Sequence, residues 1–111
     1  MATRLSFWGV GRPQGGAVGG AAARLEGVLS RLEGCVVVTA PNGVRVQPVF
    51  PAGKARWDES AGALSFGGGQ YRDGDRIVLG GGAVSSPSAY AREAGVRLAA
   101  CPVGALFAVV A

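Results

Sequence analysis

The stretch that decides the fold reads Cys35-Val-Val-Val-Thr-Ala40, Pro41-Asn-Gly43 and Val44-Arg-Val-Gln-Pro-Val-Phe50. Two runs rich in β-branched residues flank a turn signal that ends in Asn-Gly, which is the pattern of a β-hairpin. Alternation along the second run makes Arg45 and Gln47 face away from Val44, Val46 and Phe50. The stretch therefore predicts an antiparallel hairpin with one buried face.

Short β-type runs continue after the hairpin, each bounded by turns rich in glycine or aspartate. The intervals are too brief for crossover helices, so antiparallel pairing is expected. The expected strands are Ala55–Trp57, Ala63–Phe66, Gln70–Arg72, Arg76–Leu79 and a last apolar strand, Leu106–Val110. We expect the last strand to close a β-barrel against the first.

One short helix is expected after the strands. Ser86 suits the N-cap, Pro87 the first helical position, and Gly95 the turn that ends the helix. The segment Ala22–Gly34 is ambiguous, because its apolar residues match one helical face and also alternate as in a strand. Periodicity alone favours a helix there.

The 111 residues fit a single domain. Residues 9–23 are low in complexity and carry little apolar bulk. We expect residues 1–21 to form a flexible glycine-rich arm that Phe7 and Trp8 anchor to the domain. Residues 22–111 are expected to form one β-barrel domain.

The net charge and the types of reactive side chain limit the functions that this chain can have. The net charge of +4 and the pI near 9.8 favour weak binding of polyanions, but the ten arginines are dispersed and form no basic run. The chain has no histidine and one lysine, so a serine nucleophile has no recognisable base. We therefore expect no catalytic, cofactor-binding or metal-binding residues, and no enzyme activity.

Cys35 and Cys101 have two interpretations. They form a structural disulfide if the compartment is oxidising, or remain two buried small hydrophobic residues in a reducing cytosol. The N-terminal residues contain no complete signal-peptide core, which makes the cytoplasm the default location. The cell envelope or secretion is the alternative, if an export signal was removed. No stretch is long and apolar enough to span a bilayer.

A binding surface can be assembled from exposed arginines and aromatic residues. Trp57 and Tyr71, with Arg56 and Arg72 beside them, have the composition of a stacking and cationic surface for single strands, and the solvent-facing Arg45 extends the set. The alternative is that Trp57 and Tyr71 belong to the core while the arginines simply point outward, and strand alternation favours this alternative.

A series of short motifs carries a family resemblance. The motifs are Leu25-Glu-Gly27, Gly34-Cys35-Val-Val-Val, Pro48-Val-Phe-Pro-Ala-Gly53, Trp57-Asp58, Tyr71-Arg-Asp-Gly-Asp75, Ile77-Val-Leu-Gly-Gly-Gly82 and Cys101-Pro102. In this order they resemble small, mostly exported or lipid-anchored proteins of unknown function from high-GC Gram-positive bacteria. The resemblance implies an OB-like barrel with a cysteine pair, a strand rather than a helix at residues 22–34, and no catalytic residues to transfer.

Together these observations predict an all-β fold, a small closed or partly open OB-like β-barrel of five to seven short antiparallel strands with one short helix. The expected function is that of a non-enzymatic interaction module that binds a protein or polymer partner, without cofactors. The alternative is an OB-like domain that binds single-stranded nucleic acid or another polyanion.

Overall fold

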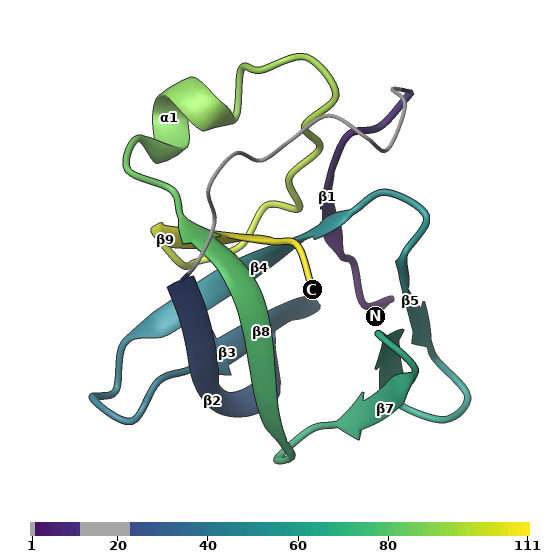
Figure 1. Cartoon of the computed structure of the whole chain (residues 1–111). Helices are drawn as coiled ribbons and strands as arrows, with labels where there is room; N and C mark the ends of the chain where they lie inside the picture. Colours follow the sequence, from purple (N-terminus) through teal and green to yellow (C-terminus); the bar gives the residue numbers. More distant parts are fainter. Residues whose placement is uncertain (1, 12–22) are drawn as a thin grey trace.

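The structure is a computed structural model that describes residues 2–11 and 23–111. It is mostly β, as expected (Figure 1). The strands are β1 Ser6–Trp8, β2 Ala23–Leu32, β3 Cys35–Thr39, β4 Arg45–Pro51, β5 Ala55–Asp58, β6 Ala63–Phe66, β7 Gly69–Arg72, β8 Arg76–Ala83 and β9 Ala105–Val109, and the short helix α1 is Pro87–Tyr90. No helix among the described residues is long and apolar enough to cross a membrane.

Five of the strands form a closed barrel, which confirms the predicted fold class. Strands β2, β3 and β4 follow one another as antiparallel neighbours, and β8 returns after a long connection to pair with the free edge of β2. This is the arrangement of a Greek key. Strand β9 then pairs with β8 and with β4, and so closes the ring.

The closure differs from the expected one. The last strand was expected to meet the first strand of the barrel, but β3 and β8 already occupy the two edges of β2. Strand β9 therefore closes against β4, and this pairing is parallel, as is the pairing of β1 with β4. The other four pairs of the ring are antiparallel, and a closed ring of five strands cannot be antiparallel throughout, so the fifth pair, β4 with β9, is parallel.

Between β4 and β8 the chain forms a second, three-stranded sheet in the order β5-β6-β7. This sheet lies beside the barrel, away from α1 (Figure 1). Its buried residues Leu64 and Phe66 share one core cluster with residues of the barrel, and the rings of Phe50 and Phe66 lie 5.1 Å apart. The two sheets therefore form one hydrophobic core.

The ambiguous segment is strand β2 rather than a helix. Leu25, Gly27 and Leu29 are buried, while Val28 is exposed, as strand alternation requires. A side chain at position 27 would collide with the carbonyl oxygen of Thr39 on β3. Glycine thus permits the close approach of β2 and β3, and the implied strand is confirmed.

The predicted arm is wrong for residues 6–8, which form strand β1. This strand pairs with β4, and Phe7 also bridges to Arg97. The indole Nε1 of Trp8 donates a hydrogen bond of 2.8 Å to the carbonyl oxygen of Val109. Phe7 and Trp8 therefore anchor the N-terminal segment, as expected, while residues 12–21 of the predicted arm lie outside the described residues.

The predicted alternation of β4 holds at Arg45, which is exposed, and at Phe50, which is buried, but not at Gln47. Gln47 is 4% exposed, whereas Val44, just before the strand, is 48% exposed. Gln47 can be buried because β1 and the segment before β9 supply hydrogen-bond partners for its side chain. Ser6 of β1 and the backbone of Ala99 both hydrogen-bond to Gln47.

Candidate functional site

A groove that combines apolar and charged groups lies where the barrel meets the three-stranded sheet. Its volume is about 630 Å³. It is lined by Trp8, Pro51, Lys54, Phe66, Gly67, Val110 and Ala111. Segments that are far apart in the sequence therefore build it together: β1, the end of β4, the hairpin between β6 and β7, and the residues after β9.

A second hollow, of about 360 Å³, adjoins the first at the tip of the β6–β7 hairpin. It is lined by Gly53, Lys54, Arg56, Ser65, Phe66, Gly67, Gly68, Gly69 and Gln70. The two hollows share Lys54, Phe66 and Gly67, but Arg56 and Ser65 belong to the opposite face of the sheet from Phe66. We call the pair of hollows the joined groove, and the first hollow, lined by Trp8, Pro51 and Val110, its apolar end.

Local structure fixes the walls of the joined groove. The hydrogen bond from Trp8 to Val109 holds the indole ring in place. The backbone of Val110 donates to the carbonyl oxygen of Gly80, which fixes the segment after β9. Gly67 and Gly68 have positive φ angles of 60° and 82°, as expected at the tip of a two-residue hairpin. The walls are therefore held by backbone and indole hydrogen bonds.

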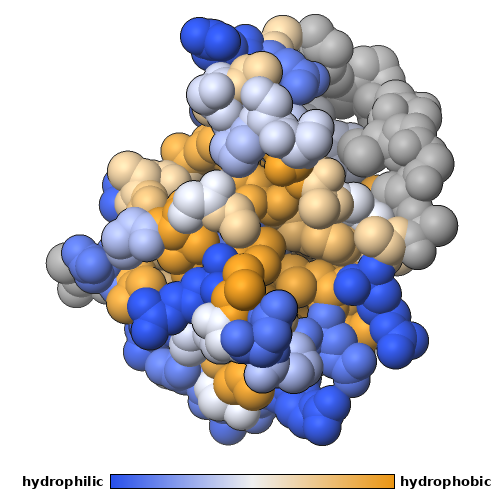
Figure 2. Space-filling model, turned by 90° about the vertical axis from the view of Figure 1, so that its left-hand side faces the viewer, coloured by the Kyte–Doolittle hydropathy of each residue, from blue (hydrophilic) through white to orange (hydrophobic). Residues whose placement is uncertain are grey.

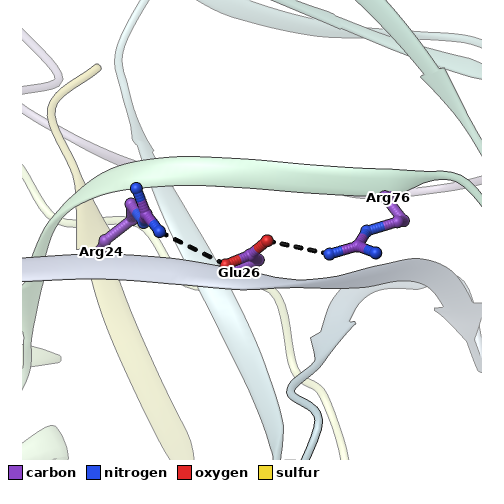
Figure 3. A network of polar contacts seen from close by, with 3 residues as sticks. All are labelled: Arg24, Glu26 and Arg76. Carbon is purple, nitrogen blue, oxygen red and sulfur yellow. Dashed lines mark hydrogen bonds and ion pairs between the residues drawn. The ribbon is translucent and has the colours of Figure 1, made fainter.

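Two arginines away from the joined groove share one carboxylate. Glu26 on β2 binds Arg24 at 3.5 Å and Arg76 of β8 at 2.9 Å (Figure 3). Within the described part of the chain, no carboxylate forms an ion pair with Lys54 or Arg56. The same holds for other described arginines, such as Arg45 and Arg72, so the lack of an ion pair does not distinguish the joined groove.

The carboxylates near the three-stranded sheet are engaged in local structure. Hydrogen bonds from the Ser60 hydroxyl, the Ala61 amide and the Ser60 amide, together with the charge of Arg56, hold the pKa of Asp58 below its usual range. The backbone amide of Thr3, then the Trp57 indole, lower the pKa of Glu59. No group of three or more His, Cys, Asp or Glu residues in the described ranges is arranged to hold a metal.

The structure separates the aromatic and basic members of the predicted binding surface. Trp57, Leu64 and Tyr71 lie opposite one another across β5, β6 and β7, so their side chains share one face of the sheet. Trp57 and Tyr71 pack against the core from this face. Arg56 and Arg72 belong to the other face, because successive residues of a strand point to opposite sides.

Two more contacts bear on this predicted surface. The guanidinium of Arg31 lies over the Trp57 ring at 5.4 Å from its centroid, so one side of the indole is already occupied. Arg45 is the first residue of β4, and Arg56 follows the last residue of that strand. Because a strand of seven residues is about 20 Å long, the length of β4 separates the two arginines. Figure 1 shows the β3–β4 turn and the three-stranded sheet on opposite sides of the barrel. Arg45 therefore does not join the other four residues.

The two cysteines are bridged. The Cα atoms of Cys35 and Cys101 are 5.9 Å apart, and their sulfur atoms form a disulfide. The bridge ties the first residue of β3 to the segment that leads into β9. It lies outside the joined groove, so we assign it a structural role.

A second apolar surface is visible on another side of the molecule. Figure 2 looks onto the side that carries the β3–β4 turn and shows a band of hydrophobic residues across its middle, with hydrophilic residues below. Apolar surface of this kind suits many partners. The joined groove differs from this band in being concave, with Lys54 beside its apolar wall.

Sequence reasoning missed most of the joined groove. Trp8 was assigned only to anchoring, while Pro51, Lys54 and Val110 were given no role in binding. The one usable signal was that Lys54 is the single lysine of the chain. No protein-family model, curated protein or solved structure matches this chain.

Proposed function

We propose that this protein is a non-enzymatic interaction module that binds a protein partner in the joined groove. The observation that carries the proposal is the hollow of about 630 Å³ at the junction of the two sheets, where Trp8, Pro51, Phe66 and Val110 form an apolar wall beside Lys54. Concave sites with apolar walls and few polar groups are typical of ligand binding.

The state of the carboxylates supports a non-enzymatic role. A general acid or base works best when its pKa lies near the working pH. Hydrogen bonds lower the pKa of Asp58 and of Glu59, which moves both away from neutrality. These carboxylates stabilise turns and the N-terminal segment instead.

The Greek-key order of the five barrel strands supports describing the barrel as OB-like. The Cys35–Cys101 bridge favours an oxidising compartment, so we propose the cell envelope or secretion, rather than the cytoplasm, as the location. The resemblance to exported proteins of Gram-positive bacteria stays a prediction.

Binding of single-stranded nucleic acid is the alternative function. Stacking on Trp57 and Tyr71 requires their rings to face a ligand, but both rings pack against the core. Lys54 and Arg56 are suited to phosphate as well as to carboxylate. We favour a protein partner because the apolar end of the groove offers no charge to a phosphate backbone.

The experiment compares two ligand classes on two matched variants. The protein is screened against a displayed library of random dodecapeptides, and the selected peptides and a labelled 20-mer of deoxythymidine are then titrated by fluorescence anisotropy. Val110→Asp alters the groove, and Val44→Asp alters a valine of similar exposure, 48% against 45%, at the β3–β4 turn.

We expect Val110→Asp to weaken binding of the selected peptides at least tenfold and Val44→Asp to change it less than twofold. Equal effects of the two substitutions, or failure to select any peptide, would contradict the proposal. Tighter binding of the oligonucleotide than of any peptide at 150 mM salt would favour the alternative function.

A further inference from the structure

We infer that reduction of the Cys35–Cys101 disulfide opens one part of this protein. With the disulfide intact, residues 84–104, which we call the cover segment, lie over the outer face of β3, β4 and β9. A dithiol that reduces the disulfide releases the cover segment and exposes that face, while the barrel stays folded. The inference concerns a different part of the molecule from the joined groove and does not rest on the proposed function.

The face of β3, β4 and β9 that points away from the barrel core is buried. Val36 of β3 belongs to the core cluster, so its neighbours Cys35 and Val37 face the other way, yet both are buried. Gln47 and Leu106 lie opposite one another across β4 and β9 and are buried too. Chain outside the barrel therefore shields this face from water.

The cover segment, together with β1, provides this shielding. The carbonyl oxygen of Ala99 accepts a hydrogen bond of 3.1 Å from Gln47, and the amide of Val84 donates one of 3.0 Å to the carbonyl oxygen of Leu106. Figure 1 shows α1 and the chain that follows it on the side of β4 and β9 away from the three-stranded sheet. Movement of the cover segment would therefore expose Gln47 and Leu106.

The cover segment itself is loosely packed. All its residues belong to the described part of the chain, and none of them is buried. Helix α1 is a single turn of four residues without a buried side chain. Segments with few buried contacts open locally at a low cost in free energy. The covalent bond to Cys35 is therefore a tie on which the closed position of this segment depends.

The other ties that the structure shows include backbone hydrogen bonds to the N-terminal segment. Phe7 and Arg97 exchange two of them, each 2.8 Å long, and the amide of Val10 donates one of 2.9 Å to the carbonyl oxygen of Gly95. Such bonds break and re-form without covalent chemistry. After reduction they hold a segment that has no buried side chain of its own, so we expect it to open.

The reductant reaches the disulfide through Cys101. Cys35 is buried, whereas Cys101 is partly exposed and lines a hollow of about 330 Å³ between α1 and residues 98–104. One thiolate of the dithiol attacks the Cys101 sulfur to form a mixed disulfide, and the electron pair of the broken bond stays on the Cys35 sulfur. The second thiolate then displaces Cys101. Two electrons pass to the protein, the dithiol becomes a disulfide, and its two protons end on the cysteines.

Limited digestion with trypsin measures the opening at one peptide bond. Both the amide and the carbonyl group of Arg97 are bound to Phe7, so the Arg97–Leu98 bond enters the protease only after the cover segment opens. The Arg76–Ile77 bond at the start of β8 reports opening of the barrel. Each rate is measured by mass spectrometry and divided by the rate for a peptide of the same sequence in the same buffer.

The samples are the oxidised wild type, the wild type reduced with dithiothreitol, and Cys101→Ser. In the last two we expect trypsin to cut Arg97–Leu98 at least tenfold faster than in the oxidised wild type. We also expect it to cut this bond at least tenfold faster than Arg76–Ile77 in the same sample. Reoxidation of the wild type is expected to restore slow cutting.

Val103→Ser, kept oxidised, is the matched control for Cys101→Ser. Val103 is also partly exposed and lines the same hollow, so the substitution alters the cover segment without breaking the disulfide. We expect its rate at Arg97–Leu98 to stay within threefold of the oxidised wild type.

Three results would overturn the inference. Equal rates at the two bonds in the reduced protein would show that the cover segment opens only with the whole barrel, and a reduced protein that fails to fold gives this result. Equal rates at Arg97–Leu98 in the oxidised and reduced wild type would show that the disulfide does not hold the segment. Equal acceleration in Val103→Ser and Cys101→Ser would show that the disulfide has no special part in it.

Discussion

Gln47 donates a hydrogen bond of 2.6 Å from its Nε2 to the Oγ of Ser6, and both side chains are buried. The same Nε2 also donates to the carbonyl oxygen of Ala99, and the Ala99 amide donates back to the Ser6 hydroxyl. This network joins β4, β1 and the segment before β9. It satisfies polar groups that would otherwise be buried without partners.

Substituting Gln47→Leu is expected to lower the free energy of unfolding by about 1–3 kcal/mol, because the buried Ser6 hydroxyl and the partly buried carbonyl of Ala99 would each lose a donor. Gln70→Leu is the matched control, since Gln70 is exposed on β7. Urea unfolding measures both variants. A Gln47→Leu protein as stable as the control would show that the network contributes no net stability.

Removal of the disulfide is expected to cost about 4 kcal/mol in the chain-entropy account, because the bridge closes a loop with a sequence separation of 66. The double variant Cys35→Ala/Cys101→Ala and the reduced wild type should unfold at similar, lower urea concentrations. Thiol titration of the oxidised, folded wild type should find no free thiol. Two reactive thiols in that sample would contradict the bridge.

Trp57→Ala is expected to destabilise the protein by about 3 kcal/mol, the lower end for a large aromatic residue, because the ring is only partly buried against the core. Unfolding is followed through the remaining tryptophan, Trp8. The variant should bind groove peptides normally under conditions where it is folded. A variant of unchanged stability that loses its ligand would show that Trp57 belongs to the binding site.

Lowering the pH is expected to reduce the stability of the fold, because Asp58 becomes protonated. The folded state lowers the pKa of this carboxyl, so its contribution is present above the ordinary value of about 3.9 and is lost as the pH falls through the folded value. We expect Asp58→Asn to be less stable than wild type at pH 7, with the difference shrinking below about pH 4. Asp73→Asn, at another turn, is the control. A difference that persists unchanged at low pH would rule out ionisation as the cause.

The sequence was sufficient to predict strands and turns but not the contacts among them. The hairpin at residues Cys35–Phe50 was predictable because its signal, two β-branched runs around Asn-Gly, lies within one short stretch of sequence. Burial of Gln47 was unpredictable from alternation, since its partners, Ser6 of β1 and the backbone of Ala99, come from elsewhere in the sequence. The parallel closure of β9 on β4 has the same non-local origin.

The candidate site was harder to predict than the fold. Trp57 and Arg56 are adjacent in the sequence, yet their side chains belong to opposite faces of one sheet. The joined groove depends on Trp8, Lys54 and Val110, which only the folded chain brings together. No local pattern links residues so far apart.

The most direct measurement follows the indole N–H signals of the two tryptophans in a ¹⁵N–¹H NMR titration with the tightest library peptide, with Trp8→Phe used to assign them. The account predicts that the Trp8 signal shifts on binding, together with the amides of Lys54 and Gly67, and that the Trp57 signal stays in place. A shift of Trp57 without Trp8 would contradict the account and place binding on the outer sheet instead of the joined groove.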